Sequence, residues 1–130
     1  MIYLDTSAVL AQLLAEDARP PASLWREPLV SSRVLEYELW VRLRARGLGR
    51  SHGDAALDLL SRLAFLELTP PVLGRALEPF PVAVRTLDAL HLASMAFLRA
   101  RGVKLTLASY DGRLSDATSA VGIPTYSLGT

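Results

Sequence analysis

The chain has no cysteine, which excludes disulfide bonds, thiolate metal sites and cysteine nucleophiles. It also has no apolar run of the roughly 18 to 20 residues that cross a bilayer, so we expect no membrane-spanning segment. The opening residues, MIYLDTSAVLAQLLAED, have no basic residue before Asp5 and no small-residue cleavage site, so we expect no secretory signal. Together these absences predict a cytoplasmic protein.

Lysine is nearly absent, since Lys104 is the only lysine among the 14 basic residues. Arginine forks suit phosphate contacts, but the codon usage of a GC-rich genome produces the same bias and is the simpler explanation. The formal net charge of +1 provides no overall attraction to nucleic acid. With 130 residues, 51% of them hydrophobic and 21% charged, the chain is expected to fold as a single domain spanning residues 1–130.

Hydrophobic periodicity alternates along the chain between strand and helix patterns, with short connections. This alternation predicts an α/β fold, a three-layer α/β/α sandwich with a mostly parallel sheet of about five strands. Ligands bind such sheets at the carboxyl ends of the strands, where the strand order reverses. Strands are expected at residues 2–4, 29–32, 65–68, 104–108 and 124–127, and helices at 8–14, 34–47, 52–63, 72–77, 84–101 and 111–121.

Two local features of the helices can be predicted as well. Ser31 or Ser32 can cap the helix that begins near Val34. The apolar residues of the helix at 84–101 recur at helical spacing and predict its buried face: Leu87, Leu90, Ala93, Ala96 and Phe97.

Four acidic residues lie where this fold would bring strand ends and helix starts toward one point: Asp5, Glu38, Asp88 and Asp111. Two like unit charges about 4 Å apart repel by roughly 4 kcal/mol at an effective dielectric constant near 20. A cluster of four carboxylates would therefore be partly protonated or would bind a cation.

Each acid alone also has a structural explanation. Asp5 and Asp111 can cap the helices that follow them, and Asp88 in a first helical turn is favoured by the helix dipole. Glu38 lies two positions after Glu36, so the two side chains point to opposite sides of a helix. The apolar spacing favours Glu38 over Glu36 as the inward-facing residue only modestly.

Four segments resemble, in order, the motifs of the PIN-domain ribonucleases and, among these, of the VapC-type toxins of bacterial and archaeal toxin–antitoxin pairs. Each segment contains one of the four acids, and the similarity extends from residue 2 to residue 126. Ser109 stands where threonine is commoner in the family. The segments are residues 2–10 (IYLDTSAVL), 32–39 (SRVLEYEL), 85–94 (RTLDALHLAS) and 107–114 (LASYDGRL).

The resemblance implies an endoribonuclease in which these carboxylates hold Mg²⁺ or Mn²⁺. Asp5 and Asp88 are the expected direct ligands, and Glu38 and Asp111 are expected to bind directly or through water. Hard divalent cations prefer oxygen ligands, and a bound cation lowers the pKa of water and stabilises charge on the attacked phosphate. Asp116 is a candidate additional ligand. Three hydroxyl residues can either orient the carboxylates or simply cap helices: Thr6, Ser7 and Ser109.

RNA binding next to an acidic site requires cationic groups nearby. Arg85 and Arg113 flank site acids in the sequence and are the expected phosphate contacts, whereas Arg42, Arg44 and Arg46 are expected to form a solvated face. We expect His91 to be a structural histidine. The resemblance also implies a small antitoxin partner and a homodimer. The alternative hypothesis is a catalytically inactive binding module of the same fold, acting through protein or RNA partners.

Overall fold

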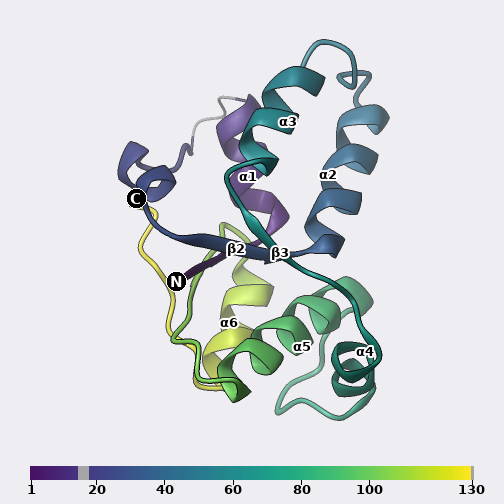
Figure 1. The fold of residues 1–130 in the computed structure, drawn as a ribbon, viewed down its shortest axis with the longest axis vertical. Helices are drawn as coiled ribbons and strands as arrows, with labels where there is room; N and C mark the ends of the chain where they lie inside the picture. The colour runs from purple at the N-terminus through teal and green to yellow at the C-terminus, as the bar shows by residue number, and fades with distance from the viewer. Residues whose placement is uncertain (15–17, 130) are drawn as a thin grey trace.

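The computed structural model of the protein describes residues 1–14 and 18–129. Strands and helices alternate along most of the chain, and a short 3-10 helix, η1, lies between α1 and β2 (Figure 1). The elements are β1 (Ile2–Leu4), α1 (Thr6–Leu14), η1 (Ala22–Arg26), β2 (Leu29–Ser32), α2 (Arg33–Ala45), α3 (Gly53–Leu60), β3 (Ala64–Leu66), α4 (Pro70–Leu77), α5 (Thr86–Ala100), β4 (Thr106–Ala108) and α6 (Gly112–Ala120).

The sheet is parallel throughout, in the order β3-β2-β1-β4. The predicted α/β fold with a parallel sheet is therefore confirmed. In the described part of the chain the sheet has four strands rather than about five, because the segment at 124–127 makes only an isolated bridge between Thr125 and Leu107. The strand order reverses between β1 and β4, which places a crevice at the carboxyl ends of these two strands.

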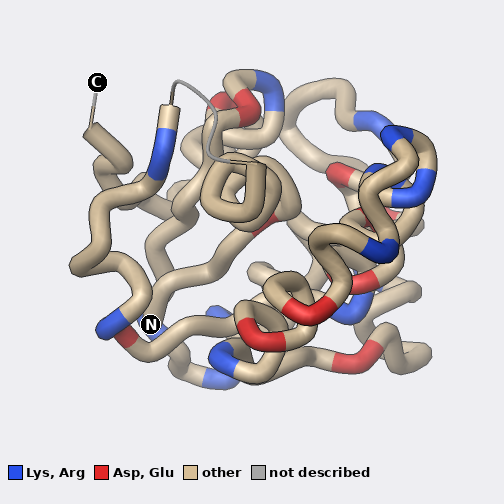
Figure 2. The backbone as a smooth tube through the Cα atoms, turned by 90° about the horizontal axis from the view of Figure 1, so that it is seen from above, with Lys and Arg blue, Asp and Glu red and all other residues tan. Residues whose placement is uncertain are grey.

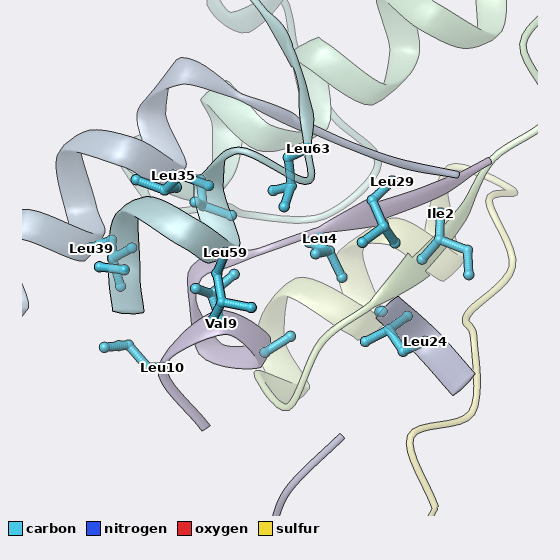
Figure 3. Close-up of a cluster of buried hydrophobic side chains, with 14 of the residues drawn as sticks. Ile2, Leu4, Val9, Leu10, Leu24, Leu29, Leu35, Leu39, Leu59 and Leu63 are labelled. Carbon is cyan, nitrogen blue, oxygen red and sulfur yellow. The ribbon is translucent and has the colours of Figure 1, made fainter. Parts of the chain in front are cut away.

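The sheet lies between two groups of helices, with α1, α2 and α3 on one side and α4, α5 and α6 on the other (Figure 1). Successive strand residues point to opposite faces. Ile2 and Leu4 of β1 therefore join the core beneath α1 to α3, which also contains Leu39 (Figure 3), whereas Tyr3 joins the core beneath α5 and α6. The three residues of β1 thus connect both cores.

The buried face of α5 includes Ala93 as predicted but otherwise differs from the predicted one. Leu87 is 37% exposed, whereas His91, Leu92 and Met95 are buried against the sheet. Leu90 lies beside α4 instead, where it lines a shallow groove between the two helices. The apolar pattern failed here because a histidine lies on the sheet-facing side, where hydrogen bonds compensate for its burial.

Two of the predicted helix caps are present. Ser32 caps α2, since its Oγ accepts a hydrogen bond from the Val34 N–H at 3.2 Å. Asp111 caps α6 through bonds to the N–H groups of Arg113 and Leu114. None of the helices in the described residues is both long enough and apolar enough to span a bilayer. Acidic and basic positions are distributed around the whole molecule (Figure 2).

Candidate functional site

The carboxyl ends of β1 and β4 lie side by side because Leu4 pairs with Ala108 in parallel register. Asp5 follows β1 directly, and its N–H donates to the carbonyl oxygen of Ala108 at 3.4 Å. Ser109 follows β4. The sheet thereby brings together two segments that are more than a hundred residues apart in sequence, and Asp5 is placed at the point where the strand order reverses.

Two serine hydroxyls hold the turns after these strands together. The Ser7 hydroxyl donates to Asp5 Oδ1 at 2.7 Å and accepts from the Tyr110 N–H at 2.9 Å. Ser109 Oγ accepts from the Asp111 N–H at 2.9 Å and lies 3.4 Å from Ser7 Oγ. Ser7 therefore orients the carboxylate of Asp5, and Ser109 holds the backbone of Asp111.

Glu38 extends from α2 toward the same place and is 7% exposed. Its Oε1 accepts from the Thr6 hydroxyl at 2.9 Å and lies 2.9 Å from His91 Nε2, while Oε2 lies 3.5 Å from Nη2 of Arg42. Glu36 points away and forms a half-exposed ion pair with Arg33 at 3.3 Å. The structure therefore separates the two glutamates clearly, where the sequence pattern favoured Glu38 only modestly.

His91 connects Glu38 to the interior of the molecule. Its Nδ1 lies 2.7 Å from the hydroxyl of Tyr3, a residue with no exposed surface, and the two rings meet edge-on at 86°. An ionised carboxylate can only accept hydrogen bonds, so Nε2 must carry a proton toward Glu38. In the neutral imidazole, Nδ1 then accepts from the Tyr3 hydroxyl. The expected structural role of His91 therefore includes holding an acid of the site.

Asp88 and Asp111 complete the acidic group. Asp88 lies in the first turn of α5, and its carboxylate forms no hydrogen bond with another of the described residues. Asp111 uses Oδ1 to cap α6. All four acids line one cavity of about 310 Å³, together with Thr6, Ser7, Arg42, Arg85, Thr86, Leu87 and His91.

The charges in this cavity do not balance. Four carboxylates face two guanidinium groups, an excess of two negative charges when His91 is neutral. Burial raises the pKa of Asp5, and the nearby charge of Asp111 raises it further. Hydrogen bonds from the hydroxyls of Ser7 and Ser109 act to lower this pKa, but the net effect is an increase. Burial, followed by the charge of Asp111, also raises the pKa of Asp88. These two acids are therefore the ones whose negative charge is least compensated by the protein.

The pKa of Glu38 shifts in the opposite direction. Burial acts to raise its pKa, but the hydrogen bonds and charge that His91, Thr6 and Arg42 supply outweigh burial, so the net effect lowers the pKa of Glu38. This carboxylate is stabilised in its ionised form by the protein itself, unlike Asp5 and Asp88. The cavity therefore contains acids of two electrostatic kinds.

The donor atoms suit a hard cation, because they are carboxylate and hydroxyl oxygens. In the described part of the chain, no group of three or more acidic or histidine side chains is arranged to hold a metal ion directly. Mg²⁺ commonly binds through one or two carboxylates and keeps several of its waters, so a direct triad is not required. The excess negative charge and the size of the cavity fit a hydrated divalent ion.

The remaining predicted residues fall in two places. Arg85 lines the acidic cavity, whereas Arg113 and Asp116 line a neighbouring one. Asp116 is absent from the lining of the acidic cavity, but it shares the neighbouring cavity with Asp88. Arg42 was assigned to a solvated face, but it pairs with Glu38 at 3.5 Å while remaining half exposed. The spacing of four between Glu38 and Arg42 on one helix was the signal that could have revealed this pair.

Comparison with known proteins agrees with this geometry. Residues 2–119 match the family model described as PIN domain. The chain is 35% identical to Ribonuclease VapC47 of Mycobacterium tuberculosis, over 99% of this chain and 98% of that protein. It is 36% identical to Ribonuclease VapC46 of the same species, over 94% and 93% of the two chains.

Solved structures share the fold. The crystal structure of VapC20 from Mycobacterium tuberculosis, a sarcin-ricin loop cleaving toxin, superposes with a TM-score of 0.71 at 24% identity, covering 97% of this chain and 98% of that one. A toxin-antitoxin complex from Klebsiella pneumoniae has a chain with a TM-score of 0.61 at 16% identity, covering 99% and 98%. With the family model matched over most of its length and full-length VapC relatives above 30% identity, this chain belongs to the PIN-domain family, among its VapC-type members.

Proposed function

We propose that the protein, as a single domain, is a divalent-metal-dependent endoribonuclease that acts as the toxin of a VapBC-type pair. The observation that carries the proposal is the convergence of Asp5, Glu38, Asp88 and Asp111 in one cavity with an excess of negative charge. The full-length relatives VapC47 and VapC46 are named ribonucleases, which supports RNA as the substrate.

Asp5 and Asp88 would hold Mg²⁺ or Mn²⁺, because their raised pKa values mark carboxylates that gain most from a neighbouring cation. Glu38 and Asp111 would contribute directly or through bound water. When present, the ion supplies an activated water and stabilises negative charge on the phosphate that is attacked.

The remaining groups of the cavity orient the acids or bind the phosphate of the RNA. Thr6 and His91 hold Glu38 Oε1 in place, so Glu38 can orient the attacking water through Oε2 or accept its proton. Ser7 fixes the rotamer of Asp5. Arg85 stands on the wall of the cavity, where its guanidinium can bind a phosphate of the RNA.

The partners follow from the same assignment. A small antitoxin would bind and silence the enzyme, in keeping with the fold shared with a chain of the Klebsiella pneumoniae toxin-antitoxin complex. Two copies would form a homodimer. The exposed leucines of α4 and α5, Leu73, Leu77 and Leu87, supply an apolar surface beside the cavity that suits such a contact. We place the protein in the cytoplasm, where its RNA substrate is.

The test compares two glutamates of the same helix. In Glu38→Gln the carboxylate of the cavity is neutralised, and we expect cleavage of single-stranded RNA to fall at least a hundredfold while the melting temperature shows that the fold persists. Asp5→Asn and Asp88→Asn are expected to abolish cleavage. Glu36→Gln is the matched control, because Glu36 lies outside the cavity, and it should cleave like the unmodified protein.

Metal dependence is measured on the unmodified protein. Cleavage should require added Mg²⁺ or Mn²⁺ and stop in excess chelator, and calorimetric titration should show a saturable metal site that Asp5→Asn weakens. Activity that persists in chelator would contradict the metal assignment. A protein that binds RNA, shows no saturable metal site and never cleaves would instead be the inactive binding module.

A further inference from the structure

A second cavity, of about 440 Å³, opens beside the acidic one. Its walls come from the segment at 82–85 before α5, from the first turn of α5, and from α6. Arg85 and Asp88 line both cavities, so the two are neighbours that share a wall. The residues that line the second cavity alone are Val82, Ala83, Val84, Arg113, Asp116 and Ala117.

The position of this cavity matters for an RNA substrate. Endonucleolytic cleavage requires nucleotides on both sides of the phosphate that is cut, so a phosphate in the acidic cavity brings a neighbouring nucleoside within one step of it. Ligand pockets commonly measure about 300 to 1,000 Å³, and single-stranded RNA is read through splayed bases that enter such pockets. The apolar wall made by Val82, Ala83, Val84 and Ala117 can cover the face of one base.

Charged side chains line the second cavity, and the nearby charge of Arg85 acts to lower the pKa of Asp88. Arg85, Arg113 and Asp116 form no ion pair or side-chain hydrogen bond with another residue among those the structure describes. Arg113 and Asp116 are three residues apart on α6, so both project from one side of the helix. Arg85 lies at the wall shared with the acidic cavity, which suits a phosphate contact, whereas Arg113 and Asp116 are left for the base.

We propose that the second cavity is a guanine subsite, which reads the nucleotide next to the phosphate that is cut. A carboxylate accepts hydrogen bonds only, and guanine alone among the four bases presents two adjacent donors, N1–H and N2–H₂, to it. A guanidinium donates only, and O6 and N7 of guanine are its usual acceptors. Asp116 therefore binds the edge with the two donors, and Arg113 binds the edge with the two acceptors.

The other bases match this pair of side chains less well. Adenine and cytosine each offer one amino group next to a ring nitrogen acceptor, and uracil offers one N–H between two oxygens, which a carboxylate repels. One good two-bond contact to a base discriminates by roughly 5- to 100-fold. The inference rests on the proposed ribonuclease function, and it adds a base preference to it.

The first experiment measures binding rather than cleavage. The 5′- and 3′-monophosphates of guanosine, adenosine, cytidine and uridine are titrated into the full-length protein, with and without Mg²⁺, and the amide resonances are followed by NMR. We expect a guanosine monophosphate to bind at least about tenfold more tightly than either uridine monophosphate. The resonances that shift should lie at residues 82–85 and 113–117.

Two variants separate the roles of Asp116 and Arg113 in nucleotide binding. Asp116→Asn should reduce the guanosine-to-uridine ratio to near one, and Arg113→Gln should weaken guanosine binding. Asp54→Asn is the matched control, because Asp54 is an exposed helical aspartate on α3, on the other side of the sheet. It should leave the ratio unchanged. Thermal melting establishes that each variant is folded.

Cleavage of a random-sequence RNA pool is the second readout. The unmodified protein should cut next to guanine, and Asp116→Asn should cut with no such preference. Equal binding of the four nucleotides, or a guanine preference that survives Asp116→Asn, would refute the subsite. Absence of metal-dependent cleavage with guanine binding intact would refute the ribonuclease function and leave the subsite standing.

Discussion

Tyr3→Phe tests the buried hydroxyl group that anchors the site histidine. The Tyr3 hydroxyl lies 2.7 Å from His91 Nδ1, and both side chains are buried. Phenylalanine keeps the ring that packs edge-on against His91, so the substitution creates no cavity. It removes only the hydroxyl group and leaves Nδ1 without a hydrogen-bond donor. The change therefore measures the net role of the buried Tyr3 hydroxyl, which bonds His91 and also interacts with Ser31 and Ser94.

The expected cost follows from burial. A buried acceptor left without its partner costs about 1–3 kcal/mol, out of a total stability of roughly 5–15 kcal/mol for a domain of this kind. The melting temperature should fall by roughly 4 to 12 °C. RNA cleavage should fall by no more than about tenfold, with KM unchanged, because Glu38 keeps its contacts to Thr6 and to His91 Nε2.

Urea unfolding at pH 7 is the appropriate assay, since the midpoint and slope together report the free energy of unfolding. Tyr37→Phe is the control. Tyr37 is 63% exposed on α2, so loss of its hydroxyl should change stability by less than about 0.5 kcal/mol. If Tyr3→Phe were as stable as Tyr37→Phe, the hydrogen bond to His91 would have no net energetic role and the proposed orientation of Glu38 through it would be wrong.

Two further predictions concern the core and the acids. Leu39→Ala, at a site with no exposed surface, should lower the free energy of unfolding by about 2–5 kcal/mol in urea, whereas Leu57→Ala, at a side chain that is 57% exposed, should change it far less. In chelator, the contribution of Asp5 and Asp88 to stability should fall as the pH rises from about 4, because the unfolded chain releases their protons before the folded protein does, whereas the lowered pKa of Glu38 acts in the opposite direction. Asp5→Asn should reduce that fall and raise the melting temperature at pH 7, and an unchanged pH profile would contradict the raised pKa of Asp5.

Much of the fold could be predicted because its signals are local. Apolar runs followed by capping residues mark β1 with α1 and β2 with α2, and Ser32 caps α2 as its sequence position indicates. The segment at 124–127 was also expected to be a strand, but it makes only one bridge to β4. Whether a short run becomes a strand depends on the edge it meets, which no local pattern contains.

For the site too, some features could be predicted from the sequence and others depend on the tertiary structure. The resemblance of four sequence segments to family motifs predicted which acids belong together, and these four acids line one cavity. Only the tertiary structure decided which of them the protein stabilises. Three residues far apart in sequence, Thr6, Arg42 and His91, meet at Glu38 and lower its pKa, whereas burial raises the pKa of Asp5. Asp116 lines only the neighbouring cavity, which it shares with Asp88. The burial of a carboxylate and the charges around it depend on residues from segments that are distant in the sequence. These contributions therefore arise only once the chain has folded.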